Sequence, residues 1–333
     1  MRRFLAALAA LALVGLAAPA SADVTVKLGT LAPDGSPWHK LLKELAQTWE
    51  KESGGQVKVK IFAGGVAGNE GDMVRKMRVG QLQASAITII GLHEIDPGPQ
   101  AIGVPGLIGD DAELKYVMSK VAPAWEKKLE DKGFVVLAWG DTGWAYFFSK
   151  KPIRTPADVA GMKVFTWAGD PKASEAWRDA GFTPVVLSAT DIVPSLTTGM
   201  IDGFANSAIM SFTARWFENA RYMPDARWGR ILGATVISKE TWEKIPADLR
   251  PKLLASARAI GGRIDTAVSK MNDDAIAAME KRGLNVVRLT PAERAEWEKL
   301  AEKTWPAMRG GSIPAAEFDA VKRARDEYRA GKR

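Results

Sequence analysis

The first part of the chain alternates strands and helices, and this order constrains the fold more than any other feature. Residues 24–28 and 57–62 alternate as β-strands do, and residues 84–90 form an almost continuous apolar run, as in a strand buried on both faces. Helical segments begin at Trp38, after Ser36-Pro37, and at Asn69. Strands connected through helices by short loops form a parallel sheet with helices on its faces. The sequence therefore predicts a doubly wound α/β lobe.

The N-terminus has the composition of a secretory signal peptide. Met1-Arg2-Arg3 is basic, residues 4–18 are apolar but too short to span a bilayer, and Ala20-Ser21-Ala22 is a small-x-small cleavage site. We expect residues 1–22 to be removed; the alternative is a short amphipathic anchor. No later segment approaches ~18 uninterrupted apolar residues, so we expect a soluble mature protein.

Cysteine usage and charge exclude several functions. The chain has no cysteine, which excludes disulfides, thiolate metal sites and thiol nucleophiles. Without Arg2 and Arg3 the formal charge falls from +7 to +5, and the basic residues are interspersed with acidic ones. This pattern favours a solvated surface over a nucleic-acid-binding face. We expect the basic but mixed residues 321–333 to form a fraying helical tail.

The sequence offers little for catalysis. His39 and His93 are far apart, and no nucleophile elbow, zinc-protease motif, Walker loop or dinucleotide fingerprint occurs. Asp110-Asp111 is typical of a helix N-terminus rather than of a metal pair. We therefore expect neither an enzyme nor a cofactor or metal site.

Residues 153–170 carry a more specific pattern. Thr155, Pro156 and Asp158 occupy the positions of an N-cap, a first and a third helical residue, Gly161 ends the turn, and a strand follows over residues 162–167. The turn and the Gly-hydrophobic-Lys-hydrophobic strand start resemble the solute-receptor subunits of tripartite ATP-independent periplasmic (TRAP) transporters, of the dicarboxylate-receptor (DctP-like) type.

Other segments match the same family in the same order. They are Ser-Pro-x-His at residues 36–39, Gly-Met-Ile-Asp-Gly at residues 199–203, and Asn206 at the position of a family asparagine that contacts ligand. The helical periodicity of residues 246–282, broken only at Gly261-Gly262, suits the long bent helix that bridges both lobes in the family. Each motif alone is weak, but together they cover essentially the whole mature chain.

The resemblance implies a two-lobed periplasmic binding protein with hinge strands and a bridging helix. Lobe I would comprise residues 23–142 with 232–262, and lobe II residues 143–231 with 263–320. The implied function is a monomeric periplasmic receptor that captures a small organic solute, such as an organic acid, and delivers it to a TRAP permease. Alternatives are a receptor for an ATP-driven importer, a ligand-sensing periplasmic protein and, from a different class, a periplasmic hydrolase or isomerase.

The predicted site departs from the family at its central residue. The family usually has a carboxylate-clamping arginine where this chain has Phe165, and Trp144 lies near the position of a second arginine. A buried carboxylate without a bidentate partner is costly, so we expect an aromatic or hydrophobic ligand body. The expected ligand-binding residues are Trp38, Glu70, Thr88, Trp144, Phe165, Trp167 and Asn206. Under the competing hypothesis Phe165 only packs beneath the strand, and Arg75, Arg78 or Lys163 holds a carboxylate.

Overall fold

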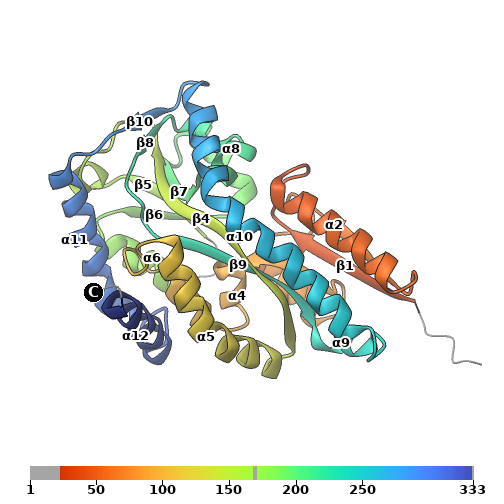
Figure 1. The fold of residues 1–333 in the computed structure, drawn as a ribbon. Coiled ribbons are helices and arrows are strands. Elements are labelled where there is room, and N and C mark those ends of the chain that lie inside the picture. The colour runs from red at the N-terminus through yellow and green to blue at the C-terminus, as the bar shows by residue number, and fades with distance from the viewer. Residues whose placement is uncertain (1–22, 168–170, 332–333) are drawn as a thin grey trace, which may run out of the picture.

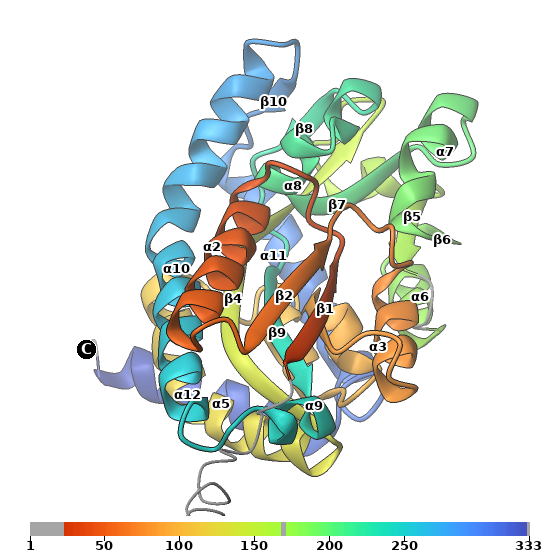
Figure 2. The same ribbon diagram turned by 90° about the vertical axis from the view of Figure 1, so that its right-hand side faces the viewer.

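The structure is a computed structural model that describes residues 23–167 and 171–331. The expected signal peptide, residues 1–22, lies outside the described residues. The strands form one ten-stranded sheet whose main path runs β2-β1-β3-β9-β4-β7-β5-β6. Helices lie on both faces of its two halves, which confirms the α/β class (Figures 1 and 2).

Lobe I contains the parallel strands β1, β2 and β3. The expected helix start after Ser36-Pro37 is confirmed, because the Ser36 side chain accepts from His39 N. The next helix begins one residue later than expected, with Asn69 as its N-cap in a capping box with Asp72. The strand expected over residues 84–90 ends early, since Thr88 caps a short helix. The lobe's elements are β1 (Val24–Thr30), α2 (Pro37–Glu52), β2 (Val57–Phe62), α3 (Glu70–Arg78), β3 (Ala84–Thr88), α4 (Ile89–His93), the 3-10 helix η1 (Gly98–Gly103), α5 (Asp111–Asp131) and α9 (Lys239–Lys244).

Lobe II repeats the arrangement around β5, which pairs in parallel with β6 and β7. The expected capping box of Thr155 and Asp158 is present. Its elements are η2 (Pro156–Val159), β5 (Lys163–Trp167), α6 (Pro171–Asp179), β6 (Thr183–Leu187), η3 (Ala189–Asp191), α7 (Ile192–Thr198), β7 (Gly203–Ser207), α8 (Ala208–Thr213), η4 (Trp216–Asn219), β8 (Tyr222–Pro224), β10 (Asn285–Val287) and α11 (Pro291–Met308).

Two long antiparallel strands, β4 (Phe134–Ser149) and β9 (Arg230–Ser238), connect the lobes. The sequence Gly-Asp-Thr-Gly at residues 140–143 predicts a loop, but β4 continues through these residues with a register shift between Asp141 and Gly143. Gly143 has φ +95°, and a Cβ there would lie 2.1 Å from Asn272 Nδ2. The change of direction is therefore made by a bulge within a paired strand.

The bridging helix α10 (Arg250–Glu280) packs on β4 and contacts α2 of lobe I and α8 of lobe II (Figure 1). The expected break at Gly261-Gly262 does not occur, since the helix is continuous there. A Cβ on Gly261 would lie 2.7 Å from Ala138 Cβ. This glycine serves the close approach of helix and strand rather than a break.

The C-terminal segment differs from the expected fraying tail. Helix α12 (Ala315–Gly331) packs on α5 of lobe I, and Val321, Ala324 and Arg325 are buried. Arg329 donates to Glu113 of α5, and Trp125 Nε1 donates to Glu317 at 2.6 Å. Because α11 packs on α6 of lobe II, the connector between α11 and α12 is a further passage between the lobes.

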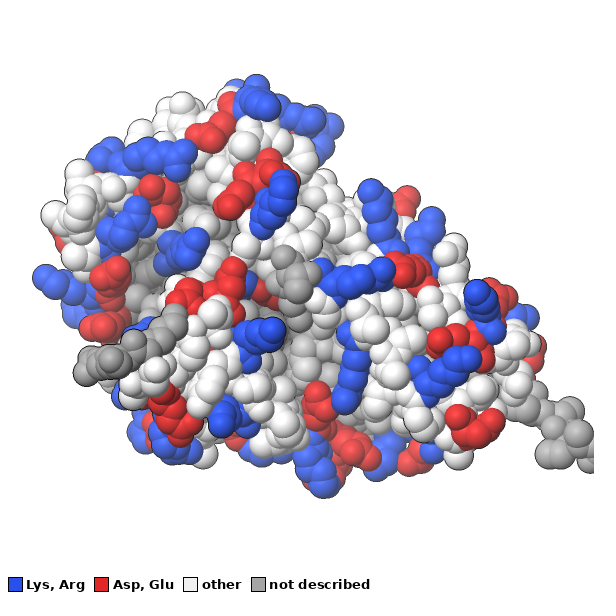
Figure 3. Space-filling view, in the orientation of Figure 1, with Lys and Arg blue, Asp and Glu red and all other residues white. Residues whose placement is uncertain are grey.

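Charge is mixed on the face shown in Figure 3, where Lys and Arg alternate with Asp and Glu. Within residues 23–167 and 171–331, no helix is long and apolar enough to cross a membrane. The same residues contain no group of three or more His, Asp or Glu side chains placed to hold a metal ion.

Candidate functional site

A cavity of about 340 Å³ lies where β4 and β9 pass between the lobes. Lobe I contributes residues of α2, β3 and α4, lobe II contributes residues of β5, α6 and β7, and α10 covers one side. Five of the seven expected ligand-binding residues line it: Trp38, Glu70, Thr88, Trp167 and Asn206. Trp139, Trp177 and Trp228 add further aromatic side chains to the wall.

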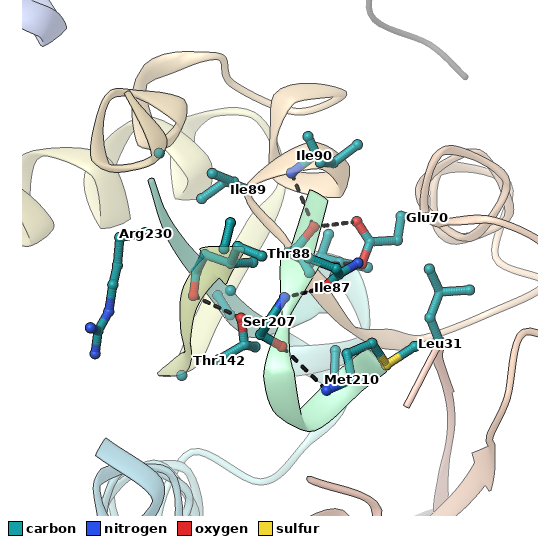
Figure 4. A pocket seen from close by; sticks show the side chains of 18 of the residues that line it. Leu31, Glu70, Ile87, Thr88, Ile89, Ile90, Thr142, Ser207, Met210 and Arg230 are labelled. Atoms are coloured by element: carbon teal, nitrogen blue, oxygen red, sulfur yellow. Dashed lines mark hydrogen bonds between the residues drawn. The ribbon is translucent and has the colours of Figure 1, made fainter. Parts of the chain in front are cut away.

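Glu70 begins α3 and is buried, and its carboxylate is bonded by the start of the neighbouring helix (Figure 4). Oε1 accepts from Thr88 N, and Oε2 accepts from Thr88 Oγ1 and Gly91 N, each at 2.8 Å. Burial raises the pKa of Glu70, and these hydrogen bonds oppose the rise only in part. The carboxyl group has no cationic partner among the described residues, and burial shifts its equilibrium toward the neutral form relative to an exposed glutamate.

Thr88 and Asn206 supply hydrogen-bonding groups from the ends of β3 and β7. Thr88 Oγ1 accepts from Ile90 N at 3.2 Å, and its hydroxyl proton is given to Glu70. Asn206 Oδ1 accepts from Ser207 N at 2.7 Å. Within the part of the chain that the structure describes, Asn206 Nδ2 makes no hydrogen bond, so it can donate to a ligand.

Arg230 lines the cavity, but its guanidinium points away from the other labelled residues (Figure 4). Nε donates to Asp141 Oδ1 at 3.0 Å, Nη2 donates to Asp141 Oδ2, and Nη1 donates to Asp111 Oδ1 at 2.7 Å. Burial lowers the pKa of Arg230, but the bonds and charges of the two aspartates outweigh it and raise that pKa. No sequence motif marks Arg230, so it is not among the expected ligand-binding residues.

Trp144 does not line the cavity, and its ring packs against arginines instead. The guanidinium carbons of Arg230 and Arg227 lie 4.8 and 5.1 Å from the ring centroid. Because neighbouring residues of a strand face opposite sides of the sheet, Trp144 points away from the side of Ala145, which does line the cavity.

Phe165 also lies outside the cavity lining. It is buried, with 3% of its surface exposed, and its ring meets the Trp167 ring edge-on at 4.9 Å. The next two residues, Thr166 and Trp167, line the cavity. The structure therefore places the departure from the family pattern beside the cavity rather than in its wall.

The alternative carboxylate-binding residues are engaged elsewhere. Arg75 pairs with Asp72, Arg78 donates to the Glu94 carbonyl, and Lys163 donates to the Gly199 carbonyl. None of them lines the cavity. Glu70 and Arg230 are the only charged residues among the described residues that do. The described wall thus offers no uncommitted cation.

His39 has a structural role. Its Nδ1 accepts from Gly35 N at 3.0 Å and lies 2.8 Å from Asp34 Oδ1. Trp177 was missed because the periodicity of α6 gives no sign that separates a cavity wall from a core. Trp228 lies in a loop that has no recognisable motif. Arg230 follows this loop as the first residue of β9.

Comparison with known proteins identifies the family. Residues 28–310 match the DctP family, described as "Bacterial extracellular solute-binding protein, family 7". The C4-dicarboxylate-binding periplasmic protein DctP of Rhodobacter capsulatus is 25% identical over 98% of this chain and 99% of the relative. The 2,3-diketo-L-gulonate-binding periplasmic protein YiaO of Escherichia coli is 24% identical over 85% of each chain.

Solved structures share the fold. A TRAP periplasmic solute-binding protein from Sulfurospirillum deleyianum with bound succinate has a TM-score of 0.83 at 22% identity, over 91% of this chain and 98% of its own. One from Desulfovibrio salexigens with bound orotic acid has a TM-score of 0.84 at 22% identity, over 92% and 99%. The two-lobed architecture is thus confirmed. The family match makes the protein a solute receptor rather than an enzyme. The chain belongs to the DctP family of bacterial extracellular solute-binding proteins.

Proposed function

We propose that this protein captures an organic solute with an aromatic or hydrophobic body between its lobes and delivers it to a TRAP-type permease. Family membership supports the receptor role, and relatives are named for dicarboxylate and keto-sugar-acid binding. The family description supports an extracellular address, which for a TRAP receptor is the periplasm. We propose that the receptor acts there as a monomer.

One observation carries the choice of ligand: the described cavity wall has no uncommitted cation. The guanidinium of Arg230 is held by Asp141 and Asp111, and Glu70 adds a carboxyl group. An ionised carboxylate transferred into such a site lacks the partner that compensates for lost hydration. Any acid group of the ligand would have to be bound by neutral donors such as Asn206 Nδ2.

The wall is mostly apolar, with polar side chains such as Thr88 and Asn206 set among apolar ones, and its rings can stack on the ligand body. Trp38 and Trp167 lie on α2 and β5, on opposite lobes. Each aromatic contact contributes roughly 0.5 to 1.5 kcal/mol beyond area burial. Thr88 and Asn206 would orient the polar end by hydrogen bonds. A mostly apolar cavity with a few placed polar groups is the usual composition of a ligand site.

Thermal unfolding against a panel of solutes tests the proposal. Ligand that binds only the folded protein at a hundred times its Kd stabilises it by about 2.7 kcal/mol, so the melting temperature should rise. Lobe closure around Trp38 and Trp167 should also change the intrinsic fluorescence. We expect aromatic and hydrophobic solutes to act and small dicarboxylates to fail. Tight binding of succinate or malate, with no response to any aromatic or hydrophobic solute, would contradict the proposal.

A further inference from the structure

The cavity extends beyond the interlobe space into the core of lobe I. Helix α2 contributes a stripe at helical spacing, Trp38, Leu41, Leu42 and Leu45, and α10 contributes a second stripe. The second stripe consists of Ala257, Ile260, Gly261 and Ile264. Leu137 of β4 and Ala86 of β3 form the floor. We call this part of the cavity, between α2, α10 and the sheet, the annex.

The two helices run antiparallel along the annex. Arg263 pairs with Glu44 at 2.6 Å, and Trp49 Nε1 donates to the Leu253 carbonyl at 3.0 Å. The C-terminal end of α2 thus lies beside the N-terminal part of α10. The annex therefore leads from Trp38 and Ile264 at the interlobe end toward Leu45 and Ala257. Trp49, with 1% of its surface exposed, closes the far end.

The annex lies inside a hydrophobic core, which makes an unfilled space unusual. Leu42, Leu45, Leu137, Ala257 and Ile260 belong to the same buried cluster as Trp49. Protein cores are packed to the density of organic crystals and contain few voids larger than a water molecule. Leucine, isoleucine and alanine side chains give water no hydrogen-bonding partner, so an apolar space of this kind favours apolar occupants.

A small residue of α10 leaves room in the annex. Ala257 belongs to the same buried cluster as Leu42 and Leu45 of α2 and lines the cavity with them. Seven residues of α-helix rise about 10 Å, which is the length of each stripe. A hydrocarbon chain or a slender ring could lie along this length with its polar end among Thr88, Asn206 and Glu70.

We infer that the solute is amphipathic: its polar end binds in the interlobe cavity and a hydrocarbon extension enters the annex. This rests on the proposed receptor function and specifies its ligand class. Binding should therefore strengthen with chain length until the annex is filled. Each methylene removed from water contributes ~0.8 kcal/mol, which is roughly a fourfold gain in affinity.

Two measurements on the mature protein test the annex without knowledge of the natural solute. Xenon-pressurised crystals should show xenon between Leu45, Leu137 and Ile260. Straight-chain primary alcohols from butanol to decanol, titrated by calorimetry, should bind roughly fourfold more tightly per added methylene. Crystals without xenon in the annex, or affinities independent of chain length, would overturn the inference.

Variants of α10 and α2 give matched controls. Ala257→Leu fills the far end and should weaken decanol about tenfold while leaving butanol unchanged, because the displaced methylenes are those of the longer chain. Ala259→Leu adds the same side chain on the exposed face of α10 and should change neither. Leu45→Ala should instead strengthen binding of the longest alcohol. Equal alcohol affinities in wild type and Ala257→Leu would contradict the inference.

The outcomes separate this inference from the proposed receptor function. If panel solutes raise the melting temperature while xenon is absent and alcohol affinities are flat, the receptor function stands and the annex fails. If xenon enters and alcohols show the chain-length gain while no organic acid or aromatic solute binds, the annex stands and the proposed solute class fails. The xenon result does not depend on any variant folding.

Discussion

The two charged residues that line the cavity are accommodated in opposite ways. Arg230, with 2% of its surface exposed, turns its guanidinium away from the cavity and forms ion pairs with Asp141 and Asp111. Glu70, with 3% exposed, keeps its carboxyl group beside the cavity and has only neutral donors: a hydroxyl and two backbone amides. Burial lowers the pKa of Arg230, but its two aspartates outweigh this effect and raise that pKa, whereas burial raises the pKa of Glu70 and its neutral donors oppose the rise only in part.

This difference shows what the cavity can offer a ligand. A charge that is paired outside the cavity helps to fix β4, β9 and α5 but gives no counter-ion to a solute. A carboxyl group held by neutral donors can accept a hydrogen bond, or donate one when protonated. Under the proposed function, the described wall therefore suits uncharged polar groups better than a carboxylate.

The largest expected effect is on stability, at Arg230. Arg230→Met removes the guanidinium that pairs with the buried carboxylate of Asp141 and should lower the free energy of unfolding by about 3 to 5 kcal/mol. Arg227 is the matched control, since it also lies over Trp144 but is exposed, so Arg227→Met should cost less than ~1 kcal/mol. Urea denaturation measures both, and equal losses would show that Arg230 acts only through the Trp144 ring.

The next effect concerns the position where the family has its clamp. Phe165→Ala should lower the free energy of unfolding by about 3 kcal/mol, because a buried ring is removed. Ligand affinity of the folded protein should stay nearly unchanged, since Phe165 lies outside the cavity lining. Trp167→Ala should weaken ligand binding, because the Trp167 side chain lines the cavity. A tenfold or greater loss of affinity in Phe165→Ala would show that Phe165 is a ligand-binding residue.

The fold was largely predictable because its signals are local. The caps at Ser36 and Thr155 and the apolar spacing of α2 depend on residues within a few positions of one another. Gly261 shows the limit of this approach. The sequence predicts a break in the helix there, but the reason for the glycine is Ala138, which is distant in sequence and close in space.

The site was predictable in part. Glu70, Thr88 and Asn206 lie at helix starts and strand ends, which the parallel topology brings to one place. Trp144 lies on the side of the bulged strand β4 that faces away from the cavity. The pairing of Arg230 with Asp141 and Asp111 joins β9, β4 and α5, which are distant in sequence. No spacing rule predicts such a network, and the tail that packs on α5 through Val321 was missed for the same reason.

A smaller effect is expected at Glu70. Glu70→Gln keeps the shape but leaves a backbone donor at Thr88 or Gly91 unsatisfied, so it should cost about 1 to 2 kcal/mol. Because the pKa of Glu70 is raised above 4.5 in the folded protein, the unfolded chain loses this proton first as pH rises. The stability advantage of wild type over Glu70→Gln should therefore shrink above pH 4.5. A growing advantage would mean that the carboxylate form is favoured.

The smallest effect belongs to a partly exposed carboxyl group with the opposite pH dependence. Arg154, just before η2, donates to Glu293 of α11, and this bond, together with those from Thr290, lowers the pKa of Glu293 to about 2. A depressed pKa stabilises the folded state above the ordinary value of 4.5, and this contribution is lost as pH falls toward 2. The difference in urea midpoint between wild type and Glu293→Gln should therefore be present at neutral pH, decline below pH 4.5 and weaken with added salt.

Wild type should thus lose its advantage over Glu293→Gln on acidification, whereas its advantage over Glu70→Gln should grow. If both differences moved in the same direction with pH, the contrast between a carboxyl group held by neutral donors and one held by a guanidinium would not hold.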